Sequence, residues 1–150
     1  MNLENQSGKA YPIEPRVGVG AITIQNRKVL LVKRGAEPSR GLWAIPGGTL
    51  KLGETLQECA AREILEETGV TIKVGDCVYV FDFIERDDEK KIKFHFVIID
   101  FAAEYVAGVP KGADDALEAR WLSAAELQEL PVSQNTIKAL SSLGFVKSES

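Results

Sequence analysis

Apolar residues recur along this chain in the two spacings that are typical of strands and of helices. Alternating or continuous apolar runs predict strands at residues 16–24, 28–33, 42–45, 77–85, 92–101 and 117–122. Helices are predicted at 56–68, from 124 to about 130, and from 133 to about 143. Strands interspersed with helices indicate an α/β domain in which a mixed sheet lies between helices.

The segments between these elements carry turn residues and charges. Asn26-Arg27 predicts a turn between the first two strands, and residues 34–41 read as a loop. The charged stretch 86–91 predicts a hairpin connection. We expect one domain over residues 1–150, with a loose polar segment over about 1–14.

The helix predicted at 56–68 has signals at both ends. Thr55 and Glu58 have the spacing of a capping box, in which each side chain binds a backbone N–H at the helix start. Gly69 suits the left-handed position that follows a helix C-terminus. Before the helix, residues 46–48 (Pro-Gly-Gly) predict a turn whose backbone can approach a ligand closely.

Three carboxylates, Glu63, Glu66 and Glu67, fall within one narrow arc of this helix because their spacing is i, i+3 and i+4. Like charges at this spacing repel, and a hard divalent cation with oxygen ligands would remove that cost. Taken alone, the triad could equally be a solvated acidic face. The opposite side of the helix is expected to pack on the sheet; it consists of Ala61, Ile64, Leu65 and Thr68.

Residues 48–70 also fit a longer pattern, G-x5-E-x7-R-E-U-x-E-E-x-G-U, in which U is a bulky aliphatic residue. Its fixed positions are Gly48, Glu54, Arg62, Glu63, Ile64, Glu66, Glu67, Gly69 and Val70. The pattern resembles the motif of the Nudix (MutT-like) hydrolase family, whose members cleave a nucleoside diphosphate linked to a further group. The resemblance implies a Nudix-type α/β/α sandwich with a mixed β-sheet between helices.

The resemblance also implies a metal site for Mg²⁺ (or Mn²⁺). Glu63, Glu66 and Glu67 would be its main side-chain ligands, and the carbonyl of Gly47 would help to bind it. Glu54 is expected nearby, either as a further ligand or bridging through water. The cation would neutralise phosphate oxygens and activate water for attack on a phosphorus of the diphosphate bridge.

Arg62 completes the expected catalytic group together with Glu63, Glu66 and Glu67. We expect Arg62 to orient or partly neutralise the acidic face; a surface salt bridge is the alternative. Family precedent offers Glu66, Glu67 or an acid from a loop as the general base.

Other site candidates lie outside the motif. In the segment 112–121, Asp114 and Asp115 precede a strand and Glu118 lies on it; Asp115 or Glu118 is expected to be an extra metal ligand or base. Loop solvation is the alternative for each.

Nucleotide contacts are also expected outside the motif. Trp43 and Phe83 could stack on a base, although aromatic residues on strands are more often core. Lys33 and Arg34 could contact phosphates, with exposed rim charges as the equal alternative.

The regions outside the motif look most like the small ADP-ribose pyrophosphatase group, which yields AMP and ribose 5-phosphate. The likeness lies in residues 11–19 and 114–122. A proline that is typical of that group about 15 residues after the motif is missing; the chain has Glu-Arg-Asp-Asp at 85–88. The alternative enzyme is a MutT-like pyrophosphohydrolase of (oxidised) nucleoside triphosphates. An alternative of another class is a non-catalytic, nucleotide-sensing Nudix domain, which would typically have lost motif glutamates that this chain keeps.

Composition limits the partners. A net charge of −4 disfavours binding to a nucleic-acid polymer, whereas a small nucleotide substrate is compatible with it. No apolar run approaches the ~18 residues of a membrane span, and the N-terminus has no apolar signal core, so we expect no membrane contact and a cytoplasmic location. Cys59 and Cys77 are expected to be small buried thiols. Family precedent suggests a homodimer.

Overall fold

The computed structural model describes residues 10–147. Most of the expected loose segment 1–14 lies outside the described residues, and residues 10–14 form no helix or strand. In chain order the elements are β1 (Arg16–Gln25), β2 (Lys28–Arg34), β3 (Trp43–Ala44), β4 (Gly47–Thr49), α1 (Leu56–Thr68), β5 (Thr71–Arg86), β6 (Ile92–Ala107), β7 (Ala116–Ser123), α2 (Ala124–Leu127) and α3 (Gln134–Ser142).

The strands of the described residues form one mixed seven-stranded sheet. β1 runs parallel to β6 and antiparallel to β2 and β4. β1 and β2 pair only at their hairpin ends; further along, β1 pairs with β4 while β2 pairs with β7. The two strands therefore diverge, and residues from their diverging parts line the cleft described below.

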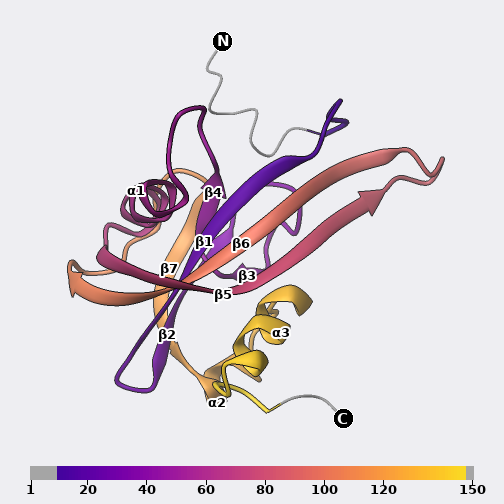
Figure 1. The fold of residues 1–150 in the computed structure, drawn as a ribbon. Coiled ribbons are helices and arrows are strands. Elements are labelled where there is room, and N and C mark those ends of the chain that lie inside the picture. The colour runs from indigo at the N-terminus through magenta and orange to yellow at the C-terminus, as the bar shows by residue number, and fades with distance from the viewer. Residues whose placement is uncertain (1–9, 148–150) are drawn as a thin grey trace.

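Helices cover both faces of the sheet, as the resemblance implied (Figure 1). Successive β2 residues point to opposite faces: Leu30 joins the cluster with α1, whereas Val29 and Leu31 join the cluster with α2 and α3. The α1 cluster also holds Ile64, and the opposite cluster holds Leu140. This arrangement is the expected α/β/α sandwich.

The structure differs from the expectation at several places. The Pro-Gly-Gly stretch does not end in a turn, because Gly47–Thr49 pair with β1 as strand β4. β5 and β6 are longer than predicted and form a long antiparallel hairpin that extends beyond the rest of the sheet (Figure 1). The prediction of two buried thiols is right for Cys59 and wrong for Cys77, which is exposed where the pairing of β5 with β6 is irregular.

The buried side of α1 also lies slightly away from the predicted one. Leu65 is exposed, whereas the carboxylate Glu67 is buried beside Thr68 and Ile64. The helix is therefore rotated so that part of its acidic face packs against β4, with which it makes direct contact.

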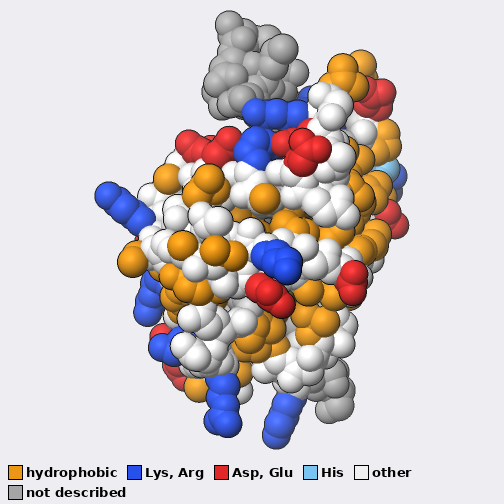
Figure 2. All heavy atoms as spheres, turned by 60° about the vertical axis from the view of Figure 1, so that its left-hand side comes forward, with side chains coloured by type: hydrophobic (Ala, Val, Ile, Leu, Met, Phe, Trp, Pro, Cys, Tyr) orange, Lys and Arg blue, Asp and Glu red, His pale blue; other side chains and the backbone are white. Residues whose placement is uncertain are grey.

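The surface is mixed in character. Hydrophobic side chains reach the surface over the middle and right-hand side of the view that brings the α1 side forward, interspersed with charged ones (Figure 2). In the described part of the chain, no helix is long and apolar enough to cross a membrane.

The cap of α1 leads to a stability prediction. The Thr55 side chain accepts a hydrogen bond from the N–H of Glu58 at 3.1 Å. Replacing Thr55 with Ala leaves that N–H without its partner, so the free energy of unfolding should fall by about 1 kcal/mol. Thr55→Ser keeps the acceptor and should stay close to wild type. Urea unfolding of both variants checks this, and equal losses in the two would contradict a role for the hydroxyl.

Candidate active site

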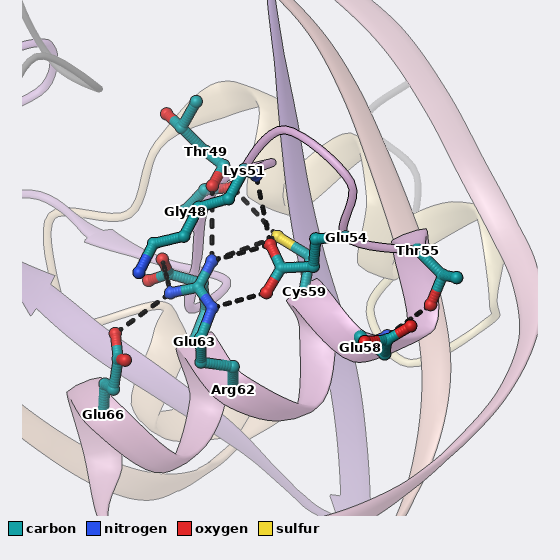
Figure 3. A network of polar contacts seen from close by, with 10 residues as sticks. All are labelled: Gly48, Thr49, Lys51, Glu54, Thr55, Glu58, Cys59, Arg62, Glu63 and Glu66. Atoms are coloured by element: carbon teal, nitrogen blue, oxygen red, sulfur yellow. Dashed lines mark hydrogen bonds and ion pairs between the residues drawn. The ribbon is translucent and has the colours of Figure 1, made fainter. Parts of the chain in front are cut away.

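The acidic face of α1 is held by a single guanidinium group, that of Arg62 (Figure 3). Its Nε and Nη2 donate to the two carboxylate oxygens of Glu54 at 2.6 and 2.9 Å, a bidentate pair. Its Nη1 donates to Glu63 at 2.7 Å and to Glu66 at 3.1 Å. Nη2 also lies 3.4 Å from the carbonyl oxygen of Thr49 on β4. Arg62 thus joins three carboxylates of the motif to the strand beside them.

Proton affinities differ sharply within this group. The hydrogen bonds from Arg62 lower the pKa of Glu54 to about 2, so Glu54 is a fixed anion. Burial raises the pKa of Glu63 in spite of Arg62. Both oxygens of Glu54 are occupied by the guanidinium, and this carboxylate does not line the cleft described below. Glu54 therefore binds Arg62 in this structure and does not face the cleft.

Glu67 is the most deeply buried carboxylate of the motif. Its side chain accepts a hydrogen bond from the backbone N–H of Gly47 at 3.2 Å. Burial first, and then the nearby Glu63, raise the pKa of Glu67 to about 8. A buried carboxylate beside a second one is costly unless positive charge lies close by. This pair is therefore suited to bind a cation.

The two glycines of β4 make room for these carboxylates. A Cβ atom at Gly48 would lie on the carboxyl group of Glu63, and one at Gly47 would lie against the backbone of Val19 and Gly20 on β1. Neither Gly47 nor Gly48 has a positive φ. The glycines are needed for close approach of strand, strand and helix, and not for an unusual backbone angle.

The oxygen donors around β4 and α1 fit a hard divalent cation. Among residues 10–147, however, no group of three or more His, Cys, Asp or Glu side chains is arranged to hold a metal ion. Arg62 draws Glu63 and Glu66 towards its own nitrogens, while Glu67 is bound to Gly47. Gathering the three glutamates around a cation requires that Arg62 release Glu63 and Glu66.

A cleft of about 850 Å³ opens beside this acidic face. Glu63, Glu66, Glu67 and Arg62 form one part of its wall. Other parts come from the hydrophobic residues of β5 and β6, from the loop after β2, and from the N-terminus of α3. A cleft with an acidic rim and an apolar wall can hold a nucleotide whose phosphates lie beside a metal ion.

Several residues that the sequence suggested lie in this cleft. Arg34 lines it, and its Nε donates to the carbonyl oxygen of Pro38 at 2.7 Å. Phe83, Asp114 and Asp115 line it as well. The negative charge of Asp115 contributes to the raised pKa of Glu67, which places Asp115 near the acidic face.

Other suggested residues lie elsewhere. Trp43 is 3% exposed and packs in the cluster with α3, so its ring is not available to stack on a base. Its backbone binds Pro131 and Ser133, so it positions the N-terminus of α3 instead. Lys33 and Glu118 pair with each other at 3.9 Å on neighbouring strands, and neither lines the cleft. Lys33 points away because adjacent strand residues face opposite sides, and Arg34 takes the cleft side.

Four charged residues that line the cleft were not proposed from the sequence: Arg16, Glu37, Lys51 and Asp100. The most deeply buried of these is Asp100 on β6. Its side chain is 3% exposed and lines the cleft. Burial raises the pKa of Asp100 to about 7. The signal in the sequence was an acidic residue inside an otherwise apolar strand, which is unusual unless the position has a function.

The Arg62 network generates a prediction about stability. Arg62→Ala leaves the partly buried Glu54 and Glu63 and the exposed Glu66 without their cation, and the free energy of unfolding should fall by about 2 kcal/mol. Arg62→Lys keeps the charge but cannot form the bidentate pair, so its loss should be smaller. Lys91→Ala removes an exposed ion pair with Glu89 and should change little. Denaturant titrations compare the three, and an Arg62→Ala protein as stable as wild type would contradict this role.

Comparison with known proteins identifies the family. The NUDIX domain model matches residues 14–143. An ADP-ribose pyrophosphatase of Methanocaldococcus jannaschii is 36% identical over 118 residues, which are 79% of this chain and 68% of the relative. The phosphatase NudJ of Escherichia coli is 31% identical over 114 residues, covering 76% of this chain and 72% of the relative.

Solved structures agree with the fold. The crystal structure of a MutT NUDIX hydrolase from Burkholderia pseudomallei has a TM-score of 0.76 and 28% identity, covering 87% of this chain and 98% of that one. A bifunctional NMN adenylyltransferase/ADP ribose pyrophosphatase from Francisella tularensis, complexed with AMP and a Mn ion, has a TM-score of 0.63 and 25% identity over 87% of this chain and 41% of that one. With its intact motif and its cleft, this chain belongs to the Nudix family and is a Nudix pyrophosphohydrolase.

Proposed function

We propose that this enzyme hydrolyses ADP-ribose to AMP and ribose 5-phosphate with the help of Mg²⁺ or Mn²⁺. The observation that carries the proposal is the buried Glu67 and the partly buried Glu63 beside it, at the rim of a cleft that also has a hydrophobic wall. A substrate with a diphosphate and a nucleoside matches both parts of such a cleft. The M. jannaschii relative named ADP-ribose pyrophosphatase supports the choice of substrate.

Glu63, Glu66, Glu67 and the carbonyl group of Gly47 would hold the cation. When bound, the cation supplies positive charge for the phosphate oxygens and lowers the pKa of a bound water. The hydrogen bond from Gly47 to Glu67 fixes this carboxylate against β4 before any substrate arrives. Arg62, held by Glu54, positions Glu63 and Glu66 before the cation binds, and both glutamates would leave Arg62 for the cation.

Arg34 is the cationic side chain best placed to bind a phosphate. It lines the cleft, and its positive charge acts on Glu67, whose pKa it lowers. A guanidinium near the acidic rim can bind phosphate oxygens on the side away from α1. Asp115, on the same side of the cleft, is the loop acid proposed as an additional ligand or base.

The likeness to a MutT NUDIX hydrolase with a TM-score of 0.76 makes a nucleoside triphosphate the second candidate substrate. The products of the reaction distinguish the two candidate substrates. ADP-ribose gives AMP and ribose 5-phosphate, whereas a triphosphate gives a nucleoside monophosphate and pyrophosphate. Chromatography of reactions with each substrate and Mg²⁺ therefore decides between them.

The role of the glutamates leads to a prediction about turnover. Glu67→Gln and Glu66→Gln each remove one negative charge from the proposed cation site, and kcat on ADP-ribose should fall roughly 10²- to 10⁴-fold. Glu58→Gln changes an exposed glutamate on the same helix and should leave kcat within a factor of two. AMP release with saturating Mg²⁺ is the measurement.

Circular dichroism should show that both active-site variants are folded. Wild-type turnover in both variants would remove the glutamates from the reaction. A wild-type enzyme that stays fully active after complete chelation of divalent ions would argue against the cation itself.

A further inference from the structure

Asp100 is a buried carboxyl group that the proposed reaction does not use. It lies on β6, is 3% exposed, and lines the cleft. Within residues 10–147, its side chain makes no hydrogen bond or ion pair, and burial is the sole cause of its raised pKa. An unpaired polar group in such a place is costly to the fold, so a ligand is the natural source of its missing partner.

Apolar side chains line the cleft around Asp100, and glycines on the neighbouring strand leave space for its carboxyl group. On the cleft side, its strand also presents Phe96 and Ile98, and β5 presents Phe81 and Phe83. The neighbouring strand β1 has glycine at two positions beside these residues, Gly18 and Gly20. A Cβ at Gly20 would lie 2.6 Å from Oδ1 of Asp100, and a Cβ at Gly18 would lie 2.7 Å from Ile98.

The position of Asp100 relative to the acidic face limits what it can bind. Gly47 on β4 pairs with Gly20 on β1, and Gly20 pairs with Asp100 on β6. Two strand spacings, roughly 10 Å, separate the backbone of Gly47 from that of Asp100, and the carboxyl group of Asp100 extends back over Gly20, which lies between them. The carboxyl group therefore lies on the cleft wall next to the acidic face and not within it. A nucleotide whose diphosphate is held at α1 would place its nucleoside part, and not its phosphates, beside Asp100.

The chemistry of the carboxyl group narrows the choice further. An ionised carboxyl group repels phosphate, and no metal-binding group of three side chains forms here. A carboxyl group accepts N–H donors in either protonation state, because one of its oxygens always remains an acceptor. The aromatic wall of Phe81, Phe83 and Phe96 offers faces and edges to a flat ring. A nucleobase that carries an amino group satisfies both features.

We propose that Asp100 is a specificity-determining residue that accepts a hydrogen bond from the 6-amino group of an adenine base bound against the β5–β6 wall. This inference rests on the proposed function, since it takes the diphosphate to lie at the glutamates of α1. Beyond the proposed function, it assigns recognition of the adenine base to the side chain of Asp100. Gly20 serves this recognition by leaving room for the carboxyl group.

The test compares ADP-ribose with an analogue whose purine lacks the 6-amino group. Wild-type kcat/KM should fall roughly 10- to 100-fold for the analogue, because Asp100 then stays buried and unpaired. Asp100→Leu should hydrolyse the two substrates at similar kcat/KM. The control Asp82→Asn changes an exposed aspartate on the neighbouring strand β5 and should discriminate as wild type does. Equal discrimination by wild type and Asp100→Leu would overturn the proposal.

Thermal unfolding separates recognition from a structural role. Asp100→Leu removes an unpaired buried carboxyl group, so its Tm should rise by roughly 3–5 °C. A lower Tm together with unchanged discrimination would make Asp100 a structural residue and overturn the proposal.

A binding experiment tests base recognition by Asp100 without relying on catalysis. Calorimetry without metal should show that wild type binds AMP at least tenfold more tightly than the purine nucleotide without the amino group. Equal affinities would overturn the role of Asp100 even if ADP-ribose is hydrolysed. Inactivity of wild type on ADP-ribose, with AMP preference retained, would reject the proposed reaction and leave the assignment of Asp100 intact.

Discussion

The close contact between helix α1 and strand β4 is the constraint on which the site depends. Gly48 leaves room for the carboxyl group of Glu63, and the N–H of Gly47 binds Glu67. Arg62 then joins Glu63 to Glu54 and Glu66. Without the two glycines the helix would have to move away, and Glu63 and Glu67 would be more solvated. The burial of Glu67 beside the partly buried Glu63 raises the pKa of both side chains and suits the pair to bind a cation.

The cleft has two chemically different ends, and the sheet sets the distance between them. The acidic end is built from α1 and β4, while the hydrophobic floor is built from β1, β5 and β6. The divergence of β1 from β2 lets residues of both strands reach the cleft, with Arg34 at the end of β2. Trp43 contributes indirectly, because its backbone anchors the residues before α3, whose first turn lines the cleft. One end of the cleft is therefore suited to the charged phosphates of a substrate, and the other end is suited to its ring.

Much of the fold and the motif could be predicted, because both rest on local signals. The helix at 56–68 and its left-handed Gly69 follow from caps and periodicity, and they agree with α1. Strand β4 was missed, since its glycine-rich sequence has no apolar alternation and forms only through pairing with β1. Long-range packing also decided that Trp43 is core, that Leu65 is exposed and that Asp100 lies in the cleft. Such contacts leave no periodic trace in the sequence.

The central claim is that the acidic face of α1 exchanges the guanidinium of Arg62 for a divalent cation. Crystals of the protein soaked with Mn²⁺ test it directly through the anomalous scattering of manganese. We expect an anomalous peak among Glu63, Glu66, Glu67 and the Gly47 carbonyl group, with the hydrogen bonds from Arg62 to Glu63 and Glu66 broken and the pair with Glu54 intact. Fully occupied manganese elsewhere, with Arg62 still bound to Glu63 and Glu66, would contradict it.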